Sequence, residues 1–336
     1  MPPLRTAGAR RRDAKSQMPR WTSLALKLGV SAGLLYWSFR GVDLGAVAGH
    51  FGRLDAFWIA AALALLVVQI VAAGQRWAWV ATRLGAPLPA GRAIRYSFAA
   101  AFFNQALPST VGGDAMRVWL LGRGDRQWKR AFHAVFVDRG AGVGFLAVVV
   151  AACLPWSLAL IAAHEGRAAV LAIGLGGVAG LAFGLALGFV SPGSRLGAWR
   201  PARLLLEIGA AARAALLDRA RGLAIALLSV AIHLLTVAAT WCLARARALS
   251  PGALDLLILI PPVMLVSMIP LSIGGWGLRE GAMVVAFGYA GIESSQALAV
   301  SVLLGVATLA VGVPGGLVWL AERSPARAPA GAQPPV

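Results

Sequence analysis

Residues 168–190 form an apolar run, AAVLAIGLGGVAGLAFGLALGFV, that contains no charged side chain. As a helix, such a run is long enough to cross the ~30 Å hydrocarbon core of a bilayer. The composition agrees, because 59% of the residues are hydrophobic and only 13% are charged, whereas a soluble domain carries about 25% charged residues. The sequence therefore predicts an all-α, polytopic membrane protein.

Six apolar segments have the length of full spans, and two further regions do not. We expect the full spans at 22–39, 57–75, 131–154, 168–190, 222–243 and 297–321. The regions 93–122 and 254–290 are interrupted by Pro, Gly and charged residues. Within the first of them, helices at 96–107 and 113–122 would be only ~18 Å and ~15 Å long. We therefore expect each region to be a re-entrant helical hairpin, with a distorted full span as the alternative.

The two hairpin regions share a ten-residue pattern. Residues 108–117 read PSTVGGDAMR and residues 270–279 read PLSIGGWGLR, so both are Pro-x-x-x-Gly-Gly-x-x-x-Arg. The copies lie 162 residues apart, close to half of the 336. A shift by the same 162 residues carries the second and third expected spans close to the fifth and sixth. This predicts an inverted-topology repeat, with halves at about 22–154 and 168–321 and a site near the bilayer midplane.

The distribution of basic residues supports the hairpins. With both regions treated as hairpins, 23 Lys and Arg fall in the inner segments and 6 in the outer ones, as the positive-inside rule requires. The inner segments are 1–21, 76–95, 117–130, 191–221 and the C-terminal tail. This topology places both chain ends in the cytoplasm.

Three segments outside the spans have their own expected roles. The basic tail 1–21 is expected to contact anionic lipid, and a nucleic-acid-binding arm is the less favoured alternative. Residues 202–221 are expected to form a basic amphipathic helix on the membrane surface, with a solvated loop as the alternative. The Pro- and Ala-rich tail 322–336 is expected to be disordered.

Several smaller patterns fit a membrane bundle. Trp residues at the expected span ends indicate an aromatic belt: Trp21, Trp37, Trp58, Trp77, Trp156, Trp241 and Trp319. Glycines every four residues predict a smooth face for close helix packing: Gly176, Gly180, Gly184 and Gly188. Cys153 and Cys242 are interpreted as small buried hydrophobes. The three histidines His133, His164 and His233 have no metal spacing, and no metal or cofactor is expected.

Charged residues at membrane depth are costly and are therefore hypotheses of function. Motif one supplies Asp114 and Arg117, with Asn104 and Gln105 just before its break. The next span opens with Asp138 and Arg139, and motif two supplies Arg279 and Glu280. Asp138–Arg139 has no counterpart in the second half. Pro-Gly kinks and structural Asp–Arg pairs between helices are the alternative interpretation.

This chemistry suits an anionic head group. Gly112–Gly113 and Gly274–Gly275 are expected to expose backbone N–H groups at the start of a half-helix, where an anion binds well. Arg117 and Arg279 would lie about one turn further on, where a guanidinium can form paired hydrogen bonds with phosphate oxygens. Ser109 and Ser272 can donate further hydrogen bonds. The carboxylates Asp114, Asp138 and Glu280 would hold the arginines or carry a coupling proton.

Three segments resemble the lysylphosphatidylglycerol synthase transmembrane-region family of flippase-like membrane proteins. They are NQALPSTVGGDAMRVWLLGR (104–123), VDRGAGVGFL (137–146) and IPLSIGGWGLREGAMVVAFGYAG (269–291). The resemblance implies a protein of the bacterial inner membrane that moves a lipid with a phosphate head group. It also implies a stand-alone member, because the sequence shows no soluble synthase domain after the membrane region. The positions that match the family's motifs are Asn104, Pro108, Ser109, Gly112, Gly113, Asp114, Arg117, Asp138, Arg139, Pro270, Gly274, Gly275, Gly277, Arg279 and Glu280. All of these except Gly277 are expected to bind substrate, and the residue chemistry adds Ser272.

The expected function is therefore transport of an aminoacylated phospholipid, a polyprenyl-linked lipid or a glycolipid between leaflets. An integral-membrane transferase or phosphatase is the first alternative, with Asp114, Asp138 or Glu280 as acid or base. A solute or ion symporter is the second alternative. An enzyme activity is not expected. The expected partners are membrane lipids, with a glycosyltransferase or an aminoacyl-lipid synthase as a candidate protein partner and no nucleic acid.

Overall fold

The computed structural model describes residues 54–106, 111–125, 127–270, 272 and 274–323. Within these ranges the protein has eleven α-helices, one short 3-10 helix and no strand. The all-α prediction is therefore confirmed. The expected basic tail, the first expected span and the C-terminal tail beyond residue 323 lie outside the described residues.

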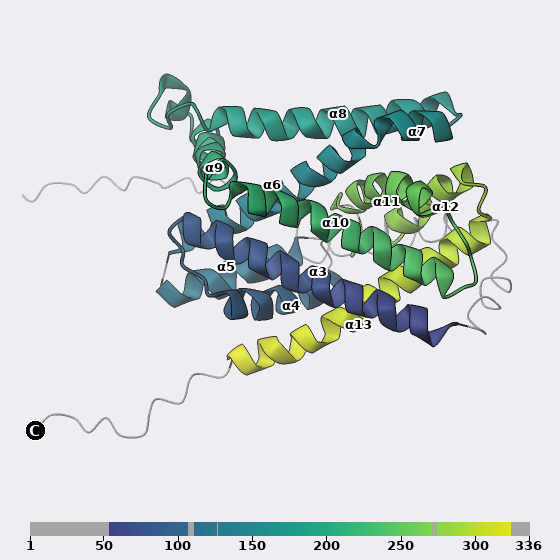
Figure 1. The fold of residues 1–336 in the computed structure, drawn as a ribbon. Helices are drawn as coiled ribbons and strands as arrows, with labels where there is room; N and C mark the ends of the chain where they lie inside the picture. The colour runs from purple at the N-terminus through teal and green to yellow at the C-terminus, as the bar shows by residue number, and fades with distance from the viewer. Residues whose placement is uncertain (1–53, 107–110, 126, 271, 273, 324–336) are drawn as a thin grey trace, which may run out of the picture.

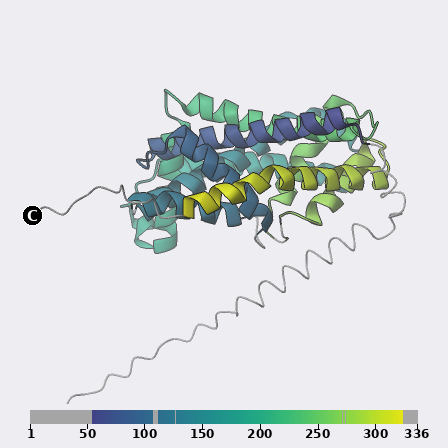
Figure 2. The ribbon, with the colours of Figure 1, turned by 90° about the horizontal axis from the view of Figure 1, so that it is seen from below.

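Five helices of the described chain are long and apolar enough to cross a membrane. They are α3 (Ala56–Arg83), α6 (Trp128–Ala152), α8 (His164–Leu187), α10 (Gly222–Arg245) and α13 (Ser294–Arg323). Each coincides with one of the expected spans, and Figure 1 shows α3, α8, α10 and α13 running lengthwise. Seen at right angles in Figure 2, α3 and α13 again extend along the length of the molecule. The prediction of a multi-pass membrane protein is confirmed.

One span boundary differs in a way that matters for the site. The hydropathy pattern places the end of the second span at residue 75, but α3 continues for two further turns to Arg83. The helix begins at Ala56 because the Asp55 carboxylate accepts a hydrogen bond from the Phe57 N–H at 2.9 Å. Arg76 therefore lies inside a helix, with an exposed fraction of 6%, and not in the cytoplasmic loop where it was expected.

The two expected hairpin regions form two pairs of shorter helices. α4 (Ala90–Ala106) packs on α5 (Gly112–Asp125), and α11 (Ala253–Ser267) packs on α12 (Leu278–Tyr289). Figure 1 shows the first pair toward the end of the bundle that carries α9, and the second pair toward the opposite end. The chain thus breaks in both copies of the motif. The insertion of the two pairs from opposite faces of a bilayer stays a prediction.

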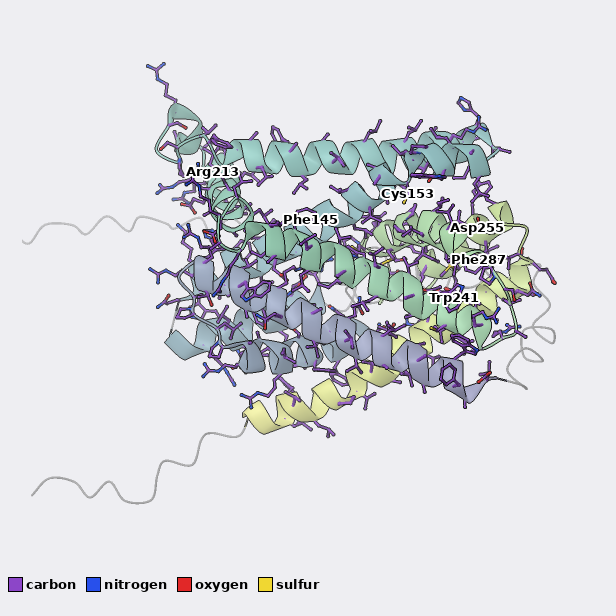
Figure 3. The ribbon with its side chains drawn as sticks, in the orientation of Figure 1. Phe145, Cys153, Arg213, Trp241, Asp255 and Phe287 are labelled. Atoms are coloured by element: carbon purple, nitrogen blue, oxygen red, sulfur yellow. The ribbon has the colours of Figure 1, made fainter. Side chains whose placement is uncertain are left out.

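Shorter helices close the two ends of the bundle. α9 (Arg200–Leu216) lies across one end, against α8 and α6, so the prediction of a helix in this segment is confirmed, while its contact with a membrane surface stays a prediction. The 3-10 helix η1 (Arg195–Ala198) precedes α9, and α7 (Leu154–Leu160) precedes α8 at the other end. Figure 3 shows this polarity, with Arg213 of α9 at one end and Asp255 of α11 at the opposite end.

The bundle core confirms some sequence expectations and corrects others. Cys153 and Cys242 are buried free thiols, as predicted. Trp77, in contrast, does not belong to an aromatic belt, because its side chain is completely buried in a cluster with Tyr96 and Leu120. A tryptophan near the end of an apolar run can face either lipid or core, and only packing decides between them.

The glycines of α8 were expected to form a packing face, and this is correct only in part. A Cβ added at Gly188, at the end of α8, would collide with the backbone of Gly209 in α9, so α8 and α9 approach closely there. At Gly176, Gly180 and Gly184, an added Cβ would meet nothing within 4 Å. The Cβ positions of these three glycines therefore face open space, although a Cβ at Gly209 of α9 would collide with the Gly184 carbonyl oxygen.

Candidate functional site

Both copies of the duplicated motif contribute to one central cavity of about 410 Å³. Motif one supplies Asp114 and Arg117 to its wall, and motif two supplies Gly274 and Arg279. A neighbouring cavity of about 260 Å³ shares Asp114 and Arg117, and also Asp138, with the first. The polar residues of the main cavity are Gln69, Arg76, Asn104, Gln105, Asp114, Arg117, Asp138, Arg139, His233, Thr236, Ser267, Arg279 and Thr308.

Asp138 lies at the centre of the first charged cluster. Its exposed fraction is 1%, and each carboxylate oxygen accepts from a different arginine. Arg76 Nε lies 2.8 Å from Oδ1, and Arg117 Nη2 lies 2.6 Å from Oδ2. A buried charge is tolerated when it is paired and hydrogen-bonded in this way. The cluster therefore ties α3, α5 and α6 together at the cavity wall.

Asp114 forms the second half of this cluster. Its carboxylate contacts Arg139, and its Oδ1 lies 3.5 Å from Arg117 Nη1. Arg117 is thus shared between Asp114 and Asp138. Three arginines and two aspartates meet here, so the first cluster has a formal net charge of +1.

The guanidinium of Arg117 also contacts an aromatic ring and has one N–H without a hydrogen-bond partner. It stacks on the Trp77 ring with 4.1 Å from Cζ to the ring centroid, which is a favourable cation–π geometry. Its Nε atom is buried and has no hydrogen-bond partner. Buried donors are nearly always satisfied, so this N–H without a partner is an exception within the described part of the protein. His233, whose Nε2 lies 2.8 Å from the Gly142 carbonyl oxygen, also has a buried Nδ1 without a partner.

The second motif builds a cluster that is electrically neutral. Glu280 is completely buried, and its Oε1 accepts from Arg279 Nη2 at 2.6 Å and from the Ser301 hydroxyl at 3.0 Å. Its Oε2 accepts from the Gly277 N–H at 2.6 Å, which caps the start of α12. Arg279 stacks on Trp276 at 4.7 Å. Each motif arginine therefore pairs with a carboxylate and stacks on a tryptophan ring. Only the first cluster has a net positive charge.

The two Gly-Gly pairs differ from the expected geometry. Gly112–Gly113 open α5, but the Gly113 N–H donates to the Asn104 Oδ1 at 2.8 Å and is not free for an anion. A Cβ at Gly113 would also collide with the Ala100 carbonyl oxygen. This glycine therefore permits the close approach of α4 and α5.

The second pair has a different backbone. Gly274 and Gly275 have φ of 56° and 80°, and the helix begins only at Leu278. These glycines supply a left-handed turn that other residues adopt at a cost. The expectation that both pairs start a half-helix is thus wrong for the second copy, and the arginines are the better candidates for binding an anion.

The remaining predicted site residues are distributed unevenly. Asn104, Arg139 and Asp138 line the cavity. Pro270 is exposed and does not line it, whereas Ser272 is completely buried with a hydroxyl that has no hydrogen-bond partner. Pro108 and Ser109 lie outside the described residues.

Two further polar residues of the cavity, Arg76 and Gln69 of α3, are not among the predicted site residues. Both line the cavity, and Gln69 Nε2 donates to the Thr236 hydroxyl at 2.9 Å. They are seven residues apart, so they lie on the same face of an otherwise apolar helix. That spacing was the available signal. His233 also lies in the cavity wall, although its spacing in the sequence does not indicate a metal site.

The comparison with protein families covers almost all of this architecture. The family model described as "Lysylphosphatidylglycerol synthase TM region" matches residues 24–316. The chain belongs to this family. The matched segment includes both helix pairs and every cavity-lining residue, which confirms the resemblance drawn from the three motif segments. Searches among curated proteins and among solved structures gave no match.

Proposed function

We propose that the protein moves a phosphate-bearing lipid between the two leaflets of the bacterial inner membrane. The observation that supports this most strongly is the central cavity with arginines from both motif copies. Four arginines and two aspartates line it, and Glu280 behind Arg279 brings the carboxylates to three. One positive charge remains for an anionic ligand. A phosphate group fits it, because a guanidinium offers paired donors that match phosphate oxygens.

The arrangement of the helix pairs supports movement across the membrane. α4–α5 and α11–α12 lie toward opposite ends of the bundle, and both reach the same cavity. In an inverted repeat, alternating access can arise when one half moves against the other around a fixed site. The head group would occupy the cavity while its chains stay in apolar surroundings outside the cavity. Lipid or ion gradients would supply the driving force.

The orientation in the membrane is part of the proposal. Arg83 at the end of α3, Arg92 near the start of α4 and Arg213 of α9 lie at the same end as the first helix pair. Basic residues favour the cytoplasmic side, so this end would face the cytoplasm, together with both chain ends. A glycosyltransferase or an aminoacyl-lipid synthase would supply the lipid.

The contacts of the carboxylates favour transport over the alternative of a lipid-modifying enzyme. Asp114, Asp138 and Glu280 each contact at least one arginine. A carboxylate held by arginines is stabilised as a counter-ion, which suits a binding site better than proton transfer. Accordingly, we propose that the protein does not change its lipid chemically.

Purified protein in phosphatidylcholine vesicles tests this function. The probe is phosphatidylglycerol with one palmitoyl chain and one fluorescent short chain, and dithionite bleaches only the outer leaflet. We expect the protein to make the inner-leaflet probe accessible, and mass spectrometry to recover the probe unchanged. A modified probe would favour the enzyme. Uptake of labelled inorganic phosphate without lipid movement would favour the symporter.

A further inference from the structure

Two apolar grooves flank the central cavity beneath α8. The first has a volume of about 440 Å³ and lies between α6, α8 and α9. The second has about 340 Å³ and lies between α8, α11 and α12, toward the other end of the bundle. Both volumes fall within the range of about 300–1,000 Å³ for ligand pockets. Every residue that lines the first groove is apolar or glycine, and Tyr289 is the one polar-tipped side chain of the second.

Each groove borders the polar cavity. Val143 of α6 lines both the cavity and the first groove, and Arg139 of the cavity is followed directly by Gly140 of the groove. Val263 of α11 lines both the cavity and the second groove. A molecule with a charged head and an apolar tail could therefore occupy a cavity and a groove at once.

We propose that these grooves hold the hydrocarbon chain of the lipid whose phosphate binds in the cavity, one groove for each leaflet. This inference rests on the proposed function and extends it to the substrate class, an amphiphile with a long chain, and to its path, which is lateral entry beneath α8. A soluble phosphate compound has no apolar chain that could fill either groove. Exposing a chain to water would cost about 0.8 kcal/mol per methylene, so apolar grooves keep the chain out of water while the head group occupies the polar cavity.

α8 fits the role of a side wall. Only 11% of its apolar 18-residue stretch is buried inside the protein. Gly180 and Gly184 line the first groove, and the space beside their Cα atoms is open. The absence of side chains at these two positions keeps the groove wide. Gly176 also faces open space, but it does not line the groove.

This difference gives a matched test. Gly180→Leu and Gly184→Leu place a side chain in the groove, while Gly176→Leu adds the same bulk to the same helix outside it. Leucine is a better helix former than glycine, so all three variants should fold. We expect the groove variants to flip the palmitoyl probe about tenfold more slowly, as for an overpacked site that costs ~1.4 kcal/mol, and Gly176→Leu to match the wild type. Equal rates for Gly180→Leu, Gly184→Leu and Gly176→Leu would overturn the inference while leaving transport itself intact.

Ala169 and Ala168 provide the same comparison for the second groove. Both are exposed on α8, but only Ala169 lines that groove. Ala169→Leu should slow flipping, and Ala168→Leu should not. Unchanged flipping by Ala169→Leu would overturn the proposal of a groove for each leaflet.

Binding measurements separate this inference from the proposed function. The probes are phosphatidylglycerol and glycerophosphoglycerol, which is the same head group without chains. Gly180→Leu should weaken binding of the first and leave the second unchanged. Equal weakening of both would contradict chain binding, because the defect would then lie in the head-group cavity. If the wild type binds lipid in this groove-dependent way but does not flip it, the result supports the chain-binding groove and contradicts the proposed transport.

Discussion

Arg117 and Asp138 form an ion pair, with 2.6 Å between Nη2 and Oδ2, that joins α5 to α6 inside the bundle. Asp138 also binds Arg76 of α3, so one carboxylate orders three helices around the cavity. Removing one partner of a buried pair leaves the other charge without compensation, and this usually costs far more than the pair contributes.

Asp138→Ala is therefore expected to destabilise the protein by about 3–5 kcal/mol. The change leaves Arg76 and Arg117 buried without their shared partner. Thermal unfolding in detergent measures the effect. Asp218→Ala is the control, because Asp218 pairs with Arg83, whose side chain is 51% exposed, and such surface pairs contribute about 0–1 kcal/mol. Similar melting temperatures for the two variants would contradict a structural role for the buried pair.

Asp114→Asn is expected to strengthen lipid binding. Asp114 contacts Arg139 and Arg117, so its carboxylate competes with a phosphate for the same guanidinium groups. Removing its charge should raise the affinity for phosphatidylglycerol roughly tenfold, or ~1.4 kcal/mol, and should slow release and therefore flipping. Asp255→Asn, at the far end of α11, is the control. Weaker binding by Asp114→Asn would show that Asp114 supports the ligand and does not compete with it.

Gly113→Ala tests the close approach of α4 and α5. An added Cβ would collide with the Ala100 carbonyl oxygen and the Asn104 side chain, and overpacking of this kind costs about 1–3 kcal/mol. Gly288→Ala in α12 is the control, since a Cβ there meets nothing within 4 Å. We expect a lower melting temperature for the first variant and an unchanged or higher one for the second. The reverse order would mean that the motif glycine has no packing role.

The attachment of α9 is expected to depend on acid pH. The hydrogen bond from Lys129 holds the pKa of Glu207 below its ordinary value of 4.5, and the nearby His133 and Arg203 act in the same direction. A carboxyl group with a lowered pKa stabilises the folded state above its unfolded pKa, and this contribution is lost as the pH falls through the folded pKa. The protection factors of the α9 amides, which are exchange rates corrected for the intrinsic pH dependence of hydrogen exchange, should therefore fall below about pH 4.5. Glu207→Gln should remove the pH dependence, and a wild type whose exchange shows no acid step would refute the assignment.

The sequence predicted the elements of the fold better than their contacts. Hydropathy located five helices, and the Gly-Gly motifs located the two breaks, because both signals are local. The sequence predicts a loop at Arg76, because a charge normally ends an apolar run. Its partner Asp138 lies 62 residues further along the chain. Only the packed structure shows that this arginine has a counter-ion and remains inside the helix.

The two copies of the motif share a sequence pattern but differ in backbone conformation. Asp114 follows the first glycine pair and Trp276 occupies the matching place in the second, and the backbones differ accordingly. Gly112–Gly113 open a helix, whereas Gly274–Gly275 form a left-handed turn. Composition at a given spacing does not determine φ, because glycine adopts both conformations readily. The asymmetry in charge between the two clusters was visible in the sequence, but its meaning required the contacts.

The flipping rate of Arg117→Ala, measured by dithionite accessibility beside Arg83→Ala, tests the central claim most directly. Arg117 lines the cavity, forms ion pairs with two aspartates and has a buried Nε without a partner. Arg83, in contrast, lies at the exposed end of α3. Loss of a charged hydrogen bond to phosphate costs about 1.5–3 kcal/mol. We therefore predict that Arg117→Ala slows flipping by at least about tenfold and that Arg83→Ala retains the wild-type rate. Equal rates for the wild type and both variants would contradict the assignment of this cavity as the phosphate-binding site.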